Sequence, residues 1–149
     1  MKTIIDAMIS SSIDTANFSA FPELLDPAKH DAQIVLFNPK TGELREFRIF
    51  HADGADVPFL WKVTNGKMHP FAVCGSDGRI HPFKRLPEGG KLRKYAKLIN
   101  AIPAARAAGI EVKVKFFCPV TGRPLTSYDS VMRGIGPKGA AELAERQSI

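Results

Sequence analysis

The chain has 149 residues, of which 44% are hydrophobic and 24% are charged, with a formal net charge of +6. These values are typical of one globular domain that is large enough to bury a core. The sequence contains no run of about 18 apolar residues, which excludes a membrane-spanning helix. Asp6 interrupts the N-terminus too early for the apolar core of a signal peptide, so we expect a cytoplasmic protein.

The two cysteines, Cys74 and Cys118, are too few for a secreted scaffold stabilised by disulfides. In a reducing compartment we expect no disulfide between them. Cys74 lies at the end of an expected strand and is interpreted as a small buried hydrophobic residue.

The positive charge is concentrated in one part of the chain. Residues 79–97 contain seven Lys or Arg and one Glu, a net charge of +6 that equals the net charge of the whole chain. Residues 1–31 contain two Lys and five Asp or Glu, a net charge of −3. Clustering of one sign indicates an anionic partner more strongly than a uniformly basic surface does.

Residues 1–31 are interpreted as an N-terminal extension or docking segment. Apolar residues near helical spacing predict a short helix within residues 4–13. The irregular apolar segment 18–25 is expected to pack onto the body of the protein or onto another subunit. Residues 32–149 then form a single domain, which includes a tail over residues 118–149.

Strands dominate the middle of the chain. Turn signals, among them Asn65-Gly66 and Asp77-Gly78, separate short apolar or β-branched runs. They predict an antiparallel meander with strands over residues 33–37, 44–50, 59–63, 68–75 and 80–85. Pro70 and Pro82 fall near facing positions and predict a bent, partly open hairpin.

The clearest helical pattern spans residues 91–102. Its apolar residues fall on one face, whereas Arg93, Lys94 and Lys97 fall on the opposite face. Pro103 is expected to kink or end this helix. Clean alternation predicts a sixth strand over residues 110–117, and Pro137 is expected to begin a last helix.

The tail contains Cys118-Pro-Val-Thr-Gly-Arg-Pro-Leu-Thr126, then Ser130 and then Gly134-Ile-Gly-Pro137. This segment resembles a family of uncharacterised small zinc-binding domains of phage and bacterial proteins. The family pattern runs Cys-x-x-Cys-Gly-Arg-x-Leu-Thr, then Ser, then Gly-Ile-Gly-Pro-x-Cys. The matching positions are Cys118, Gly122, Arg123, Leu125, Thr126, Ser130, Gly134, Ile135, Gly136 and Pro137.

The resemblance covers residues 118–139 and implies a zinc-knuckle-and-helix shape of phage or mobile-element origin. Thr121 and Gly139 stand where the family has Cys, and structural zinc is normally held by four ligands. We therefore expect a degenerate, zinc-less knuckle, with no metal and no cofactor. A composite metal site is conceivable only if separate strands bring together Cys74, Cys118, His69 and His81.

Catalytic motifs are missing from the sequence. It has no phosphate-binding Walker loop, no His-Glu-x-x-His and no Gly-x-Ser-x-Gly. The best acidic cluster is His51, Asp53 and Asp56, and a solvated loop is its simpler interpretation. We therefore predict a protein that is not an enzyme.

Aromatic residues interleave with the basic segment, a combination that holds single-stranded nucleic acid through phosphate contacts and base stacking. The structural alternative is that the rings belong to the core and the lysines simply solvate a helix. The sequence predicts non-catalytic, sequence-tolerant binding of nucleic acid, with single-stranded DNA favoured, in a phage or mobile-element context; it does not separate DNA from RNA. The candidate contact residues are Trp61, Phe71, Arg79, Phe83, Lys84, Arg85, Lys91, Arg93, Lys94 and Lys97.

A second hypothesis fits the same charge pattern. A small phage-encoded protein can bind and modulate a host enzyme through a basic surface without any chemistry of its own. The apolar N-terminal segment would then serve as a docking arm, or would support a homo-oligomer. The expected fold is α+β: a curved antiparallel sheet of five or six short strands, one amphipathic helix, and the knuckle plus a C-terminal helix.

Overall fold

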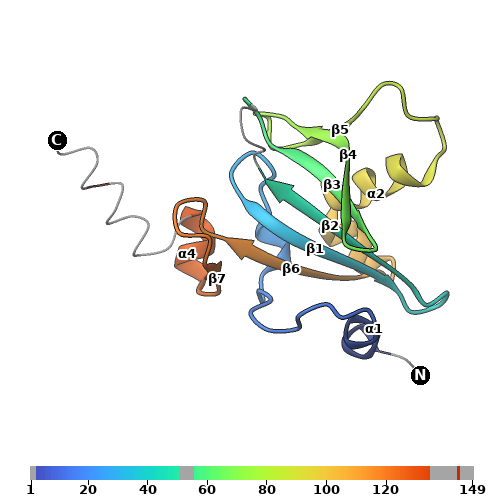
Figure 1. The fold of residues 1–149 in the computed structure, drawn as a ribbon, viewed down its shortest axis with the longest axis horizontal. Coiled ribbons are helices and arrows are strands. Elements are labelled where there is room, and N and C mark those ends of the chain that lie inside the picture. The colour runs from blue at the N-terminus through green and yellow to red at the C-terminus, as the bar shows by residue number, and fades with distance from the viewer. Residues whose placement is uncertain (1–2, 51–55, 135–143, 145–149) are drawn as a thin grey trace.

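The fold is that of a computed structural model, which describes residues 3–50, 56–134 and 144. An antiparallel sheet of seven strands forms its centre, in the order β5-β4-β3-β2-β1-β6-β7 (Figure 1). Helices pack on this open, curved sheet, so the predicted α+β class is confirmed. The sheet has one strand more than the upper limit of the prediction, because the tail adds a short strand.

The strands follow the predicted meander closely. Asn65 and Gly66 both have positive φ, 51° and 76°, as the tight Asn-Gly hairpin turn requires. The bounds are β1 (Asp31–Asn38), β2 (Glu43–Phe50), β3 (Phe59–Thr64), β4 (Lys67–Cys74), β5 (Ile80–Pro82), β6 (Glu111–Phe117) and β7 (Pro124–Leu125). The pairing of β3 with β4 shifts register after Leu60, beside Pro70. The bend was predicted in the next hairpin, between β4 and β5, where Pro82 pairs with Ala72, and it stays a prediction.

The helices are short and their ends have local causes. A capping box between Thr3 and Asp6 begins the first helix. Ala101, with φ of −139°, ends the expected helix over 91–102, and Pro103 lies in the first turn of the next one. The bounds are α1 (Ile4–Ser10), the 3-10 helix η1 (Pro22–Leu24), α2 (Lys91–Asn100), α3 (Ile102–Ala107) and α4 (Tyr128–Arg133). No helix within the described ranges is both long and apolar enough to cross a bilayer.

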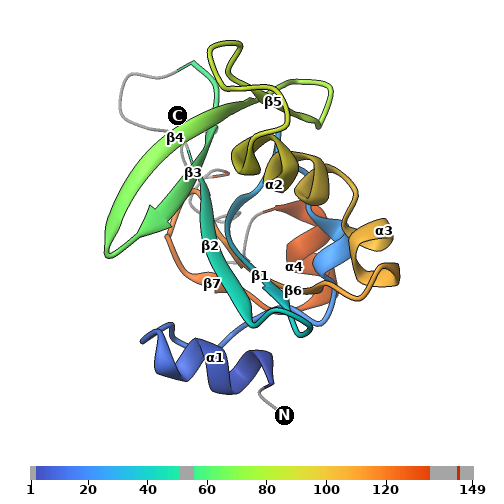
Figure 2. The same ribbon diagram turned by 90° about the vertical axis from the view of Figure 1, so that its right-hand side faces the viewer.

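The two faces of the sheet have different coverings (Figure 2). On one, here called the helix face, side chains such as Ile34, Phe47 and Val114 pack with Tyr95 and Ile99 of α2 in the main core. Successive side chains of a strand point to opposite faces of the sheet, so residues two positions apart on β1, β2 and β6 enter this core.

The opposite face carries a smaller core. Val35 and Phe37 of β1 pack there against Ile4, Ala7 and Met8 of α1. The N-terminal segment therefore packs onto the body, where the Ser19 N–H also donates to the Val114 carbonyl at 2.8 Å.

The tail forms a compact turn and a helix. The Gly122 N–H donates to the Cys118 carbonyl at 2.8 Å, and Gly122 has φ of +71°, a conformation that glycine adopts without strain. The strand β7 pairs with β6, and α4 follows; neither was predicted. The helix expected from Pro137 lies outside the described residues.

Candidate nucleic-acid interface

Three lysines lie on the solvent side of α2. Lys91, Lys94 and Lys97 are exposed, and their spacing of three residues places them along one side of the helix. Within residues 3–50 and 56–134, no ion pair joins any of them to a carboxylate. Their charges are therefore available to an external anion.

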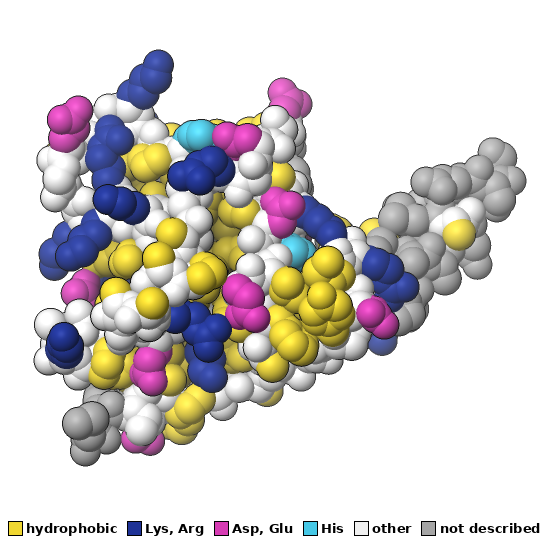
Figure 3. Space-filling view, turned by 180° about the vertical axis from the view of Figure 1, so that it is seen from behind, with side chains coloured by type: hydrophobic (Ala, Val, Ile, Leu, Met, Phe, Trp, Pro, Cys, Tyr) yellow, Lys and Arg dark blue, Asp and Glu magenta, His cyan; other side chains and the backbone are white. Residues whose placement is uncertain are grey.

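Further exposed cations come from the loop before α2 and from the turn before β5. Lys84 and Arg85 are exposed in that loop, and Arg79 is exposed just before β5. Figure 3 shows Lys and Arg side chains gathered over α2 and the loop that leads into it. We call the following six residues the cationic surface: Arg79, Lys84, Arg85, Lys91, Lys94 and Lys97.

Arg93 does not belong to this surface, although it lies in the same segment. Its Nη2 donates to the carbonyls of Leu86, Phe83 and Lys84 at 2.9, 3.2 and 3.2 Å, and its Nε donates to Leu86 at 3.1 Å. The side chain is half-buried and fastens the loop 83–86 to α2. Arg93 was predicted to contact nucleic acid. This prediction is wrong, because its guanidinium donates its hydrogen bonds to backbone carbonyls of the protein.

Phe71 was also predicted as a contact residue, and this prediction is wrong. Its side chain is 2% exposed in the main core, with its ring 5.9 Å from that of Phe47. It occupies the register shift between β3 and β4, and both it and Ala72 belong to the main core. A ring in this position cannot stack on a base.

Trp61 is half-buried, but it lies on the face of the sheet opposite to α2. The register pairs Trp61 with Arg48 and the neighbouring Leu60 with Ile49, and Leu60 and Ile49 both enter the main core. Because side chains alternate along a strand, Trp61 points away from that core. It is therefore not a neighbour of the lysines on α2, contrary to the expected mixed surface.

Trp61 is one member of a row of aromatic rings, here called the ring ladder. It stacks on Phe50 at 5.1 Å and 11°, and Phe59 meets it edge-on at 6.4 Å. Phe83 in turn meets Phe59 edge-on at 6.1 Å. Phe50 and Trp61 therefore cover one face of each other, and the edge contacts of Phe59 join this pair to Phe83.

Arg48 extends the ring ladder toward β6. Its guanidinium carbon lies 5.0 Å from the centre of the Phe117 ring and 5.9 Å from that of Phe50. Within the described residues, Arg48 Nε and Trp61 Nε1 are buried without a hydrogen-bond partner. For the Arg48 guanidinium, the faces of the Phe50 and Phe117 rings stand in for hydrogen bonds. The alternation of residues 48, 50, 59 and 61 was a signal for this ladder that sequence reasoning missed.

Phe83 is the ring that connects the two regions. Arg85 lies over its face, with the guanidinium carbon 5.0 Å from the ring centre. The ring is half-buried between Phe59 and this exposed guanidinium. Of the predicted aromatic contacts, only Phe83 adjoins the cationic surface.

A cavity of about 300 Å³, here called the α2 cavity, opens beside Lys91 and Lys94. On its wall the Tyr95 hydroxyl donates to Glu43 Oε1 at 2.6 Å, and Arg45 Nη2 lies 3.3 Å from the same oxygen. The hydrogen bond from Tyr95, with the nearby charges of Arg45 and the two lysines, lowers the pKa of Glu43. This carboxylate therefore stays ionised at neutral pH.

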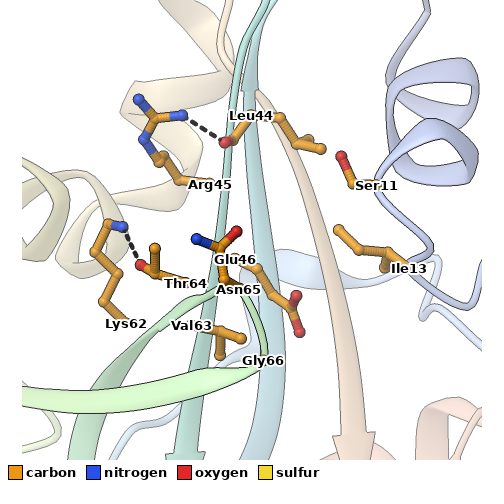
Figure 4. A pocket seen from close by; sticks show the side chains of 10 residues that line it. All are labelled: Ser11, Ile13, Leu44, Arg45, Glu46, Lys62, Val63, Thr64, Asn65 and Gly66. Carbon is orange, nitrogen blue, oxygen red and sulfur yellow. Dashed lines mark hydrogen bonds between the residues drawn. The ribbon is translucent and has the colours of Figure 1, made fainter.

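A second groove of about 500 Å³ lies where the end of the β3–β4 hairpin separates from β2 (Figure 4). Leu44, Glu46 and Val63 point toward Ile13, whereas Lys62 points away from it. Lys62 donates to the Thr64 hydroxyl at 2.6 Å, and burial lowers its pKa. The walls mix polar and apolar groups without a convergent reactive set.

In the described part of the chain no metal site is assembled, and the Cys74 thiol is not activated. No three His, Cys, Asp or Glu side chains there come together as metal ligands, so the composite site with Cys74 and His81 is not assembled. Burial raises the pKa of the Cys74 thiol to about 12, which keeps it protonated. Within the acidic loop considered for catalysis, His51 and Asp53 lie outside the described residues.

Comparison with known proteins adds no family. No family model, no curated protein and no solved structure matches this chain. The resemblance of the tail to small zinc-binding domains stays a prediction.

Proposed function

We propose that this protein binds nucleic acid through the cationic surface, without sequence-specific contacts along most of the bound strand. The observation that carries the proposal is the row of exposed lysines on α2, none of which forms an ion pair with a carboxylate within the described residues. Lys84 and Arg85 extend this charge along the preceding loop. Such a surface attracts the closely spaced charges of a phosphate backbone.

Single-stranded DNA is the form that we favour. Phe83 lies in the same loop as Lys84 and Arg85, so a base can approach the part of its ring that Phe59 and Arg85 leave exposed, beside the phosphate contacts. The ring ladder supplies rigidity rather than a stacking platform, because its rings are engaged with one another. Most of the affinity then comes from charge, and binding weakens steeply as salt rises.

A charge-reversed variant tests this proposal. The variant K91E/K94E/K97E should fold as the wild type does, because these side chains make no hydrogen bond or ion pair within the described residues, and it should lose at least about 100-fold in affinity for a labelled single strand. Fluorescence anisotropy at low salt measures the affinity. Arg93 is left unchanged because it holds the loop 83–86.

The matched control reverses three cations elsewhere, in K67E/K113E/R123E. These side chains also make no ion pair within the described ranges, and the net charge changes by the same amount. The control should lose far less affinity than the α2 variant. Equal losses in the two variants, or no binding by the wild type at low salt, would contradict the proposal; the second outcome would favour an acidic protein partner.

A further inference from the structure

The α2 cavity has the shape of a site for one small group. It lies between α2, the adjoining ends of β1 and β2, and the turn that follows α3. Leu36, Leu98 and Ile110 give it apolar walls, and its volume of about 300 Å³ is at the lower end of the range for ligand cavities. One planar, mostly apolar ring system is the kind of group that such a cavity holds.

The polar groups of the cavity divide into a rim and a wall. Lys91 and Lys94 line it from α2 and are exposed to solvent. Glu43 lies on the wall, where Tyr95 and Arg45 fix its Oε1. Its Oε2 accepts no hydrogen bond from any residue in the described part of the chain, so a fixed acceptor remains open.

This arrangement discriminates between the parts of a nucleotide. On the wall, Glu43 is paired with Arg45, so the net positive charge of the cavity lies on the two lysines at its rim, which attract a phosphate there. A neutral base can enter the cavity, and an amino group on its edge can donate to Glu43, as amino groups of bases do to carboxylates in protein–DNA contacts.

We propose that the α2 cavity binds one nucleotide of the bound strand, with its phosphate on Lys91 and Lys94 and its base inside, where an exocyclic amino group donates to Glu43 Oε2. The inference rests on the proposed function, because the rim lysines belong to the cationic surface. It adds a preference at one position: cytosine, which carries an amino group at this edge, is favoured over thymine, which presents a carbonyl oxygen there.

The test compares oligo-dC with oligo-dT of equal length on the wild type, E43Q and E88Q. The wild type should bind oligo-dC about fivefold more tightly, the low end of the discrimination from one base contact. The variant E43Q should bind the two homopolymers with similar affinity, because an amide can also donate a hydrogen bond to thymine. Glu88 is exposed in the loop before α2, so E88Q removes the same charge and should keep the ratio.

Filling the cavity provides a second, uncharged test. Ala108 lines the cavity, whereas Ala104 is exposed on α3 outside it. The variant A108F should lower oligo-dC affinity about fivefold, the same loss of one base contact, and A104F should leave it unchanged. Binding of both homopolymers with equal affinity, or equal affinities of A108F and A104F, would overturn the cavity assignment while leaving the proposed function intact. No binding of either homopolymer would overturn both.

Discussion

The two faces of the sheet use the same residue types in opposite ways. On the side covered by α2, lysines project into solvent without carboxylate partners among the described residues. On the opposite face, Arg48 lies against the Phe117 and Phe50 rings, and Lys115 is buried between the Phe18 ring at 4.9 Å and Asp14 at 3.5 Å. Arg48 and Lys115 are thus engaged internally, whereas the three lysines of α2 are available.

This difference shows why charge and aromatic content identify a candidate surface but not its members. Trp61 and Lys94 are both suitable residues for nucleic-acid binding by type. The pairing of β3 with β2 places Trp61 in a ladder of rings, whereas the periodicity of α2 places Lys94 in solvent. Substitutions on each side should therefore affect different measured quantities.

The largest effect is expected for a ring that the sequence assigned to the interface. Phe71→Ala removes a fully buried ring from the main core and should lower the free energy of unfolding by about 3–5 kcal/mol. Phe83→Ala, at a half-buried ring, should cost less. Urea unfolding measures both, and equal costs for the two variants would contradict the burial of Phe71.

The next effect separates two neighbours on α2. Arg93→Met removes the bonds from the guanidinium to the carbonyls of the loop 83–86 and should lower the free energy of unfolding by about 1–2 kcal/mol. Lys94→Met removes a side chain that makes no ion pair with any residue the structure describes and should change the free energy of unfolding by less than about 0.5 kcal/mol. A larger loss of stability in Lys94→Met than in Arg93→Met would contradict the assignment of Arg93 to internal bonds and of Lys94 to solvent.

On the opposite face, Arg48→Met should lower the stability of the protein and leave its affinity for nucleic acid unchanged. Loss of the contacts with the Phe50 and Phe117 rings should lower the free energy of unfolding by about 1 kcal/mol. Affinity for a labelled single strand should stay at the wild-type value. A drop in affinity larger than that of Lys94→Met would assign the opposite face to the interface.

The smallest expected effect concerns the junction between the body and the tail. His30 Nδ1 accepts from the Asp26 N–H at 2.9 Å, so its Nε2–H donates to the Val131 carbonyl at 2.7 Å, and burial lowers the pKa of His30. The unfolded chain therefore binds a proton more readily than the folded protein does. Stability should be full above about pH 6.5, the ordinary value for histidine, and should fall as pH drops below it.

Urea midpoints at several pH values would measure this dependence, and His30→Gln should reduce its slope between pH 5 and 7. An unchanged slope in that variant would show that other groups carry the pH dependence.

Local patterns were sufficient to predict most of the fold. Alternation and turn residues placed six strands within a few residues, and the apolar periodicity of residues 91–102 placed α2. The strand β7 was missed because Pro124 and Leu125 are too few for a periodic signal, and their pairing with β6 depends on the turn at Gly122.

The candidate site was predicted only in part. The lysines of α2 could be assigned because helical periodicity separates them from Tyr95 and Ile99. The roles of Arg93 and Phe71 depend on contacts with the loop 83–86 and with a register shift, which local periodicity does not encode. Glu43 was missed because 52 residues separate it from Tyr95, its hydrogen-bond partner.

The salt dependence of single-strand binding is the decisive measurement for a cationic interface on α2. Plots of log Kd against log salt should be obtained for the wild type, for K91Q/K94Q/K97Q, and for the control K67Q/K113Q/R123Q. If each lysine on α2 neutralises one phosphate, the slope for the α2 variant should be smaller by about 2, and the control should keep the wild-type slope. Equal slopes for the two variants would show that the lysines of α2 do not contact the strand.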